Sequence, residues 1–192
     1  MEVVTLIEKY YAPGSKAYHF LIHHGRMVAA KALQVAGRLN GKCPASTFPD
    51  STFIEEASLL HDIGIYLTHA PEIGCFGPHP YIVHGFLGRE ILEREGLPEH
   101  ALVCERHVGM GLTVVDIEAN GFPLPLRDMT PHTLEEKIIC FADKFYSKYE
   151  KTLLQEKPVA EVRKTIARYG EDKLKRFDEW MRFFGEPEHN DK

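Results

Sequence analysis

The sequence lacks any run of about 18 apolar residues, so it contains no segment of the kind that spans a bilayer. Its first residues, MEVVTLIEKYY, include Glu2 and Glu8 and show no basic start followed by an apolar stretch, so they do not resemble a secretory signal. We therefore expect a soluble cytoplasmic protein that has no membrane partner.

Cysteine is scarce and widely spaced, at positions 43, 75, 104 and 140, and no CxxC pair occurs. This spacing argues against a disulfide framework and against a structural zinc site. We expect reduced, buried thiols.

An excess of positive charge is also missing. The formal net charge is -5 and the pI is near 6.1. These values argue against a nucleic-acid partner and against a polybasic membrane surface, although they leave a local basic pocket open. No internal repeat or low-complexity tract divides the chain, and 192 residues suit one domain, or one domain with a short appendage.

Strand signals are sparse, and apolar residues recur mostly with helical spacing. The pattern predicts an all-α fold of about eight helices, with irregular segments at 40–50, 68–80 and 109–132. The expected helices lie near 2–11, 15–39, 53–63, 81–95, 98–108, 112–119 and 133–150, followed by two amphipathic helices in the last forty residues. Ser15 and Thr133 are predicted N-caps, with Glu136 placed as in a capping box.

Five of these helices each carry a potential metal ligand on their apolar face: His24, His61, His84, His107 and Asp143, with Asp62 adjoining His61. A single buried histidine is ordinarily a hydrogen-bonded core residue, and a single aspartate can cap a neighbouring helix. Asp143, however, lies in the apolar run IICFADKF and needs a cation or a strong donor. Four imidazoles and two carboxylates suit Mn, Fe, Co, Ni or Zn better than Mg or Ca.

Three segments resemble the HD superfamily of metal-dependent phosphohydrolases. They are HHGRMVAAKAL around His24, ASLLHDIG at 57–64, which contains the HDIG form in full, and KIICFADKF around Asp143. The resemblance covers roughly residues 15–150. It implies an HD-domain helical bundle over 1–150 and a C-terminal helical extension over 151–192 packed on the same domain.

Two further segments, HGFLGREIL at 84–92 and ERHVGMG at 105–111, resemble elements of family members that hold two metals. Such members include the HD-type diadenosine tetraphosphate hydrolases and the cyclic-dinucleotide phosphodiesterases, although the Gly-Tyr-Pro signature of the second group is absent. GFPLPLRDMTPHTLEEKIICFADK most resembles uncharacterised HDIG proteins. The resemblance implies one metal at His24, His61, Asp62 and Asp143, and a second at His84 and His107 with Asp62 bridging.

The implied chemistry is attack of a metal-activated water molecule on phosphorus. The expected substrate is a small nucleotide or a related phosphorylated metabolite, and the expected cofactor is two divalent ions, with Fe or Mn ahead of Co, Ni or Zn. Beside Asp62, the candidate catalytic residues are Lys144 and Arg26, for which a solvent-facing charge is the alternative. Arg106 and His79 are candidate substrate-binding residues.

Two other functions stay open. Some HD proteins use the same six ligands as di-iron oxygenases, and a non-catalytic, metal-dependent ligand-binding module is the third possibility. A homodimer through the last helix, which carries Trp180, is also left open.

Overall fold

The computed structural model describes residues 3–39, 48–148 and 152–187, and most of these residues are helical, which confirms the predicted all-α class. The α-helices within these ranges are α1 (Val3–Glu8), α2 (Lys16–Arg38), α3 (Ser51–Leu60), α4 (His84–Arg94), α5 (Pro98–Arg106), α6 (Val114–Asn120), α7 (Leu134–Asp143), α8 (Val159–Ile166) and α9 (Glu171–Phe184). Short 3-10 segments are η2 (Ile63–Leu67), η3 (Pro71–Ile73), η4 (Tyr81–Val83) and η6 (Ala167–Tyr169).

Side chains fix the starts of the longer helices, as predicted. Ser15 caps α2 by accepting a hydrogen bond from the amide of Tyr18, and Asp50 caps α3. Thr133 caps α7 by accepting a hydrogen bond from the amide of Glu136, but the Glu136 carboxylate binds the amide of His132 instead of closing a capping box.

Two predicted elements were wrong in detail. The helix expected over 133–150 ends at Asp143, because the chain turns away and the carbonyl of Phe145 accepts a hydrogen bond from the amide of Lys157. The segment at 68–80 is not wholly irregular, since β1 (His69–Ala70) and β2 (Cys75–Phe76) form a small antiparallel ribbon. Most of the predicted 40–50 loop, the position of Cys43 and the boundary near residue 150 lie outside the described residues.

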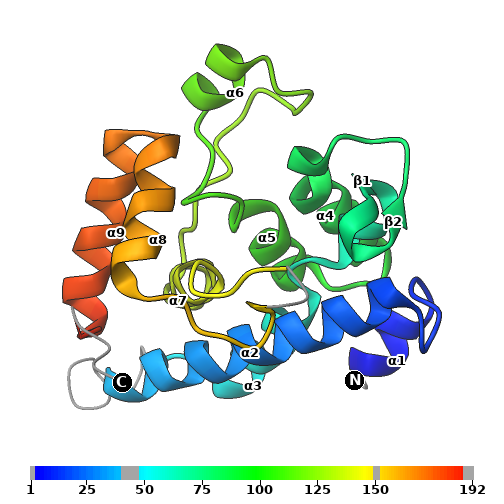
Figure 1. The fold of residues 1–192 in the computed structure, drawn as a ribbon, viewed down its shortest axis with the longest axis horizontal. Helices are drawn as coiled ribbons and strands as arrows, with labels where there is room; N and C mark the ends of the chain where they lie inside the picture. Colours follow the sequence, from blue (N-terminus) through cyan, green and yellow to red (C-terminus); the bar gives the residue numbers. More distant parts are fainter. Residues whose placement is uncertain (1–2, 40–47, 149–151, 188–192) are drawn as a thin grey trace.

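The helices surround α7, which is seen nearly end-on in the middle of Figure 1. The long helix α2 runs along one side with α3 packed against it, while α4 and α5 form a neighbouring pair. Helices α8 and α9 stand together beside α7, above the C-terminal half of α2. The short helix α6 and the loop that follows it project from the body.

The two C-terminal helices share the main hydrophobic core with α2, α3 and α7. Phe177 of α9 stacks on Phe141 of α7 with ring centroids 5.2 Å apart, and both side chains are fully buried. The buried ammonium of Lys31 on α2 pairs with Glu186, 2.5 Å away, and with Glu156, 2.7 Å away, which attaches the segments on either side of α8 and α9 to α2. Among the described helices, none has both the length and the apolar character needed to cross a membrane.

Candidate metal centre

Four predicted ligands come together where the interior of α2, which carries His24, meets the C-terminal ends of α3 and α7. Donor atoms of His24, His61, Asp62 and Asp143 all lie within 4.8 Å of one another, and all four residues are buried. His24 Nε2 lies 2.9 Å from Asp143 Oδ1 and 3.4 Å from Asp62 Oδ2. His61 Nε2 lies 3.2 Å from Asp62 Oδ2 and 3.5 Å from Asp143 Oδ1. These residues form one donor cluster.

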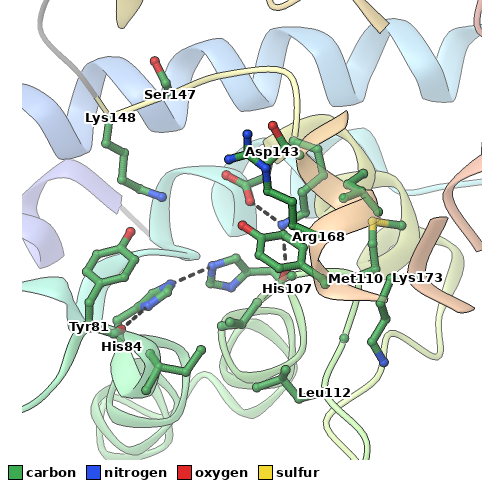
Figure 2. A pocket seen from close by; sticks show the side chains of 18 of the residues that line it. Tyr81, His84, His107, Met110, Leu112, Asp143, Ser147, Lys148, Arg168 and Lys173 are labelled. Carbon is green, nitrogen blue, oxygen red and sulfur yellow. Dashed lines mark hydrogen bonds and ion pairs between the residues drawn. The ribbon is translucent and has the colours of Figure 1, made fainter. Parts of the chain in front are cut away.

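A second cluster shares Asp62. Its other carboxylate oxygen, Oδ1, lies 3.3 Å from His84 Nε2 and 3.4 Å from His107 Nε2. The two imidazole Nε2 atoms are 3.1 Å apart, and Figure 2 shows the two rings pointing toward each other. Because Oδ2 faces the first cluster and Oδ1 faces the second, Asp62 has the geometry of a bridging ligand.

Three of the ligand histidines follow directly on a helical segment: His61 after α3, His84 after η4 and His107 after α5. A carbonyl oxygen has two lone pairs, and the last carbonyls of a helix lack their usual amide partner four residues on, so they can accept a further hydrogen bond. The carbonyl of Tyr81 also accepts a hydrogen bond from the amide of His84. Each ring places Nδ1 against the carbonyl three residues earlier: His61 on Ser58 at 2.6 Å, His84 on Tyr81 at 2.7 Å and His107 on Cys104 at 2.7 Å. Nδ1 must therefore carry the proton, which leaves the Nε2 lone pair for a metal.

The clusters fit divalent transition metals on geometric grounds. Metal–ligand bonds of about 2.1 Å at octahedral or tetrahedral angles place neighbouring donor atoms about 3.0–3.4 Å apart. The donor–donor distances given above, from 2.9 to 3.5 Å, are close to that range. With both Nδ1 atoms acting as donors, His84 and His107 direct two lone pairs at each other, an unfavourable contact that a cation relieves. His61 Nε2 and Asp62 Oδ1 are buried without a hydrogen-bond partner among the described residues, while Asp62 Oδ2 contacts the ammonium of Lys148 at 2.8 Å. We conclude that these side chains suit a metal-binding role.

The electrostatics agree with this role. Burial lowers the pKa of His24 to about 4 and the pKa of His107 to about 3, so both rings are neutral at physiological pH, as ligands must be. Burial opposes ionisation of Asp62 and Asp143, but neighbouring histidine and lysine side chains outweigh it and hold the pKa of each carboxyl well below its usual range. His61 differs, because burial lowers its pKa but the two carboxylates outweigh burial and raise the pKa to about 9. Without a metal this ring is therefore charged and must release a proton to become a ligand.

Lys144, predicted as a catalytic residue, lies against the centre. Its ammonium is 2.7 Å from Asp143 Oδ2 and donates to the carbonyl of His107 at 2.9 Å, so it connects the two clusters. Both polar contacts hold protein groups in place. The structure thus gives Lys144 a positioning role at the ligands.

Sequence reasoning missed Lys148, whose ammonium lies 2.8 Å from Asp62 Oδ2. Figure 2 shows its side chain extending toward the histidine rings, and its ammonium lies 5.9 Å from the ring centre of Tyr81. Burial lowers the pKa of Lys148, but Asp62, Tyr81 and Asp143 together raise it by more, so the group stays charged. The segment ADKFYSKY places Lys148 five residues after Asp143, but a helix continued through this segment would point the Lys148 side chain away from the ligands.

The centre opens into a cavity of about 670 Å³, in the size range of small-molecule sites. His84, His107 and Asp143 form part of its wall, and α6, α8, η6 and α9 supply much of the remainder. Five lysine and arginine side chains line it against three carboxylates; the cations are Lys144, Lys148, Lys157, Arg168 and Lys173. Despite the net negative charge of the chain, the pocket is basic.

Three predicted residues do not reach this cavity. Arg26 is exposed on α2, on a different face from His24. Arg106 pairs with Glu136, 2.9 Å away, because that buried carboxylate needs a cation. His79 is exposed, and its backbone pairs with Leu67 and His69 beside the ribbon. The structure therefore places Arg26, Arg106 and His79 outside the cavity lining, and their predicted roles stay predictions.

The chain is similar to several proteins. An uncharacterised protein of Methanocaldococcus jannaschii is 42% identical over 95 residues, which cover 49% of this chain and 48% of that protein. A tRNA (cytidine(56)-2′-O)-methyltransferase of Thermoplasma volcanium is 28% identical over 73% of this chain, and one of Picrophilus torridus is 34% identical over 51%.

The match covers 36% of the Thermoplasma protein and 25% of the Picrophilus protein, so the chain spans less than half the length of these curated relatives. No solved structure matches it significantly. The HD domain family matches residues 21–147, a segment that includes all six ligand residues and most of the helices around them. The chain belongs to the HD domain family.

Proposed function

We propose that the chain is a metal-dependent phosphohydrolase that cleaves a phosphoester or phosphoanhydride bond in a small nucleotide or a related phosphorylated metabolite. One observation carries this proposal: two buried donor clusters share Asp62 and open into a cavity whose lining is rich in lysine and arginine. Such a cavity suits an anionic substrate, and the donor set suits the metals that hydrolyse phosphate esters.

The roles of the side chains follow from their contacts. Divalent ions, when bound, supply Lewis acidity and lower the pKa of water toward neutrality. Asp62 connects the two clusters through its separate oxygens, while His24, His61 and Asp143 complete one cluster and His84 and His107 the other. Lys144 fixes the orientation of Asp143.

Lys148 carries a charged ammonium beside Asp62 and also lines the cavity. From this position it is suited to bind the oxygens of a phosphoryl group and to stabilise the charge that develops on them during cleavage. Lys148 therefore replaces Arg26 as the second candidate basic residue of the reaction.

The proposed cofactor is a pair of divalent ions, with Fe or Mn expected first and Co, Ni or Zn as alternatives. The test begins with metal analysis of the purified protein, followed by phosphatase and phosphodiesterase assays with each of these metals. Diadenosine tetraphosphate belongs in the substrate panel, because we propose that the two-metal resemblance extends to the hydrolases of that compound.

Asp62→Ala should abolish both metal binding and phosphate release, because it removes the oxygens that face both clusters. His23→Ala is the matched control, since His23 adjoins His24 on α2 but belongs to neither donor cluster. Full metal content in Asp62→Ala would show that the proposed centre is wrong.

A di-iron oxygenase is the second candidate, because four imidazoles and two carboxylates also suit iron. Oxygen uptake by the iron-loaded protein distinguishes it from a hydrolase. Substrate-dependent oxygen consumption without phosphate release would refute the hydrolase proposal. A metal-dependent binding module without catalysis would show tight substrate binding and no turnover.

The remaining proposals concern partners and location. We propose that the chain binds a small phosphorylated molecule and binds neither nucleic acid nor a membrane. A homodimer stays an open alternative, and the proposed location is the cytoplasm. Because two relatives are named tRNA methyltransferases, tRNA is the nucleic acid to test. Retention of tRNA by the protein at physiological salt would refute the exclusion of nucleic acid.

A further inference from the structure

The cavity extends well beyond the donor clusters, and its basic side chains differ in what they contact. Lys144 pairs with Asp143 and Lys148 pairs with Asp62. Lys173, on α9, lies 2.5 Å from Asp116 on α6 and is almost fully buried. These three cations already have carboxylate partners.

The other two cations of the cavity lining, Lys157 and Arg168, form no ion pair among the described residues. Lys157 donates to the carbonyl of Tyr146 at 3.1 Å, and no ion pair is found for it among the described residues. Arg168, in η6, is exposed at the cavity and likewise has no ion pair within the described part of the chain. Both therefore have donor groups free to bind an anion.

The surroundings of Lys157 increase its need for such an anion. The side chain is half-buried, and burial, together with the charges of Lys144 and Lys148, lowers its pKa. A partly buried ammonium without a carboxylate in contact is unfavourable unless an anion enters. The charges of Asp143 and Glu161 oppose this lowering of the pKa, but neither carboxylate forms an ion pair with Lys157, and Asp143 is itself bonded to Lys144.

Arg168 adds a guanidinium group, whose planar shape matches that of a phosphate edge. A guanidinium group binds phosphate through two parallel hydrogen bonds, whereas an ammonium acts as a point charge. Apolar side chains, among them Met110, Leu112 and Ile166, also line this cavity and give it a surface for an uncharged part of a ligand. The combination suits a molecule that carries phosphate on an apolar or aromatic body.

We infer that Lys157 and Arg168 form a second anion subsite, which selects substrates bearing a second phosphate besides the one at the donor clusters. This inference rests on the proposed function for the role of the first phosphate. Both residues lie beyond 21–147, the segment that matches the HD domain family. The subsite is thus a feature of the C-terminal segment of this chain, with Lys157 just before α8 and Arg168 between α8 and α9.

Isothermal titration of the purified, metal-containing protein tests the subsite with three probes. Adenosine 5′-monophosphate carries one phosphate, while ADP and adenosine 3′,5′-bisphosphate carry two at different separations. We expect at least one of the two-phosphate probes to bind about tenfold or more tightly than the monophosphate. Where a probe is turned over, KM replaces the dissociation constant.

Lys157→Ala and Arg168→Ala should each remove most of that preference while leaving the affinity for the monophosphate and the metal content unchanged. Arg168→Lys should restore part of it, because the charge returns without the paired donors. Lys164→Ala is the matched control, since Lys164 is an exposed cation of α8 outside the cavity lining. That variant should keep the full preference.

Equal affinity for all three probes, or no binding of any, would overturn the subsite, as would an equal loss for the monophosphate in the variants. The proposed function fails separately. If no substrate releases phosphate but the variants lose the preference, the subsite stands and the hydrolase proposal is wrong. If phosphate is released and the preference survives both substitutions, the hydrolase proposal stands and the subsite is wrong.

Discussion

Gly64, the glycine of the HDIG segment, lies where a side chain has no room. A Cβ atom at this position would lie 2.2 Å from the carbonyl oxygen of His84 and 2.4 Å from the amide nitrogen of Gly88. Both are backbone atoms of α4, so no change of rotamer relieves the overlap. Gly64→Ala must therefore move the start of α4 away from η2 by about 1 Å.

This movement has two measurable consequences. Overpacking of a close-packed contact typically costs about 1–3 kcal/mol, and two overlaps with backbone place Gly64→Ala at about 3 kcal/mol of lost stability. Because His84 begins α4 and Asp62 precedes η2, the same movement lengthens the distance of 3.3 Å between Asp62 Oδ1 and His84 Nε2. Affinity for metal at Asp62, His84 and His107 should fall more than affinity at the other cluster.

Urea denaturation of chelator-treated protein measures the first effect, and titration with Mn followed by metal analysis measures the second. Gly37→Ala is the control, because a methyl group on Gly37, inside α2, would meet no described atom within 4 Å apart from the backbone of its own helix. Alanine favours a helix interior, so this variant should gain up to about 1 kcal/mol. Wild-type stability and metal content in Gly64→Ala would refute the reasoning.

Three further results are expected. Lys144→Met should weaken metal binding about 10- to 100-fold, because Asp143 loses the cation that orients it. Arg106→Ala should cost about 2 kcal/mol in denaturant unfolding and leave metal content unchanged, because its partner carboxylate is buried whereas Arg106 is partly exposed. Chelator-treated protein should lose stability as the pH falls from about 6.5 toward 4, because unfolding releases His24 and His107 to take up protons.

Each result has a contrary outcome. Lys175→Met, at an exposed lysine of α9, is the control for Lys144→Met, and equal metal affinity in the two variants would exclude a positioning role. Loss of metal from the Arg106→Ala variant would show that Arg106 supports the metal centre. For the pH effect, His61 contributes nothing in this window, because its raised pKa keeps it protonated in both states below 6.5 and its contribution is lost only as the pH rises toward 9. Constant stability from pH 6.5 to 4 would contradict buried, neutral histidines.

Helical periodicity predicted most of the helices and the six candidate ligands that the structure brings together, because both depend on which residues face the core. It did not predict the direction of individual donor atoms. His61, His84 and His107 lie at the ends of helical segments, where a carbonyl of the last turn accepts a hydrogen bond from Nδ1. Spacing along a helix cannot show this, since it depends on where the helix ends.

The C-terminal limit of α7 explains why the basic side of the cavity was missed. In a helix continued to residue 150, Lys148 would lie about 140° around the axis from Asp143 and would point away from the ligands. The chain instead leaves the helix after Asp143, and the amide of Lys157 binds the carbonyl of Phe145. One tertiary hydrogen bond thus accompanies the turn that brings Lys148 to Asp62 and Lys157 to the cavity, and no local pattern in residues 144–148 specifies it. The candidate ligands depend on local sequence, whereas the surface that we propose selects the substrate depends on how the last two helices pack against α2 and α7.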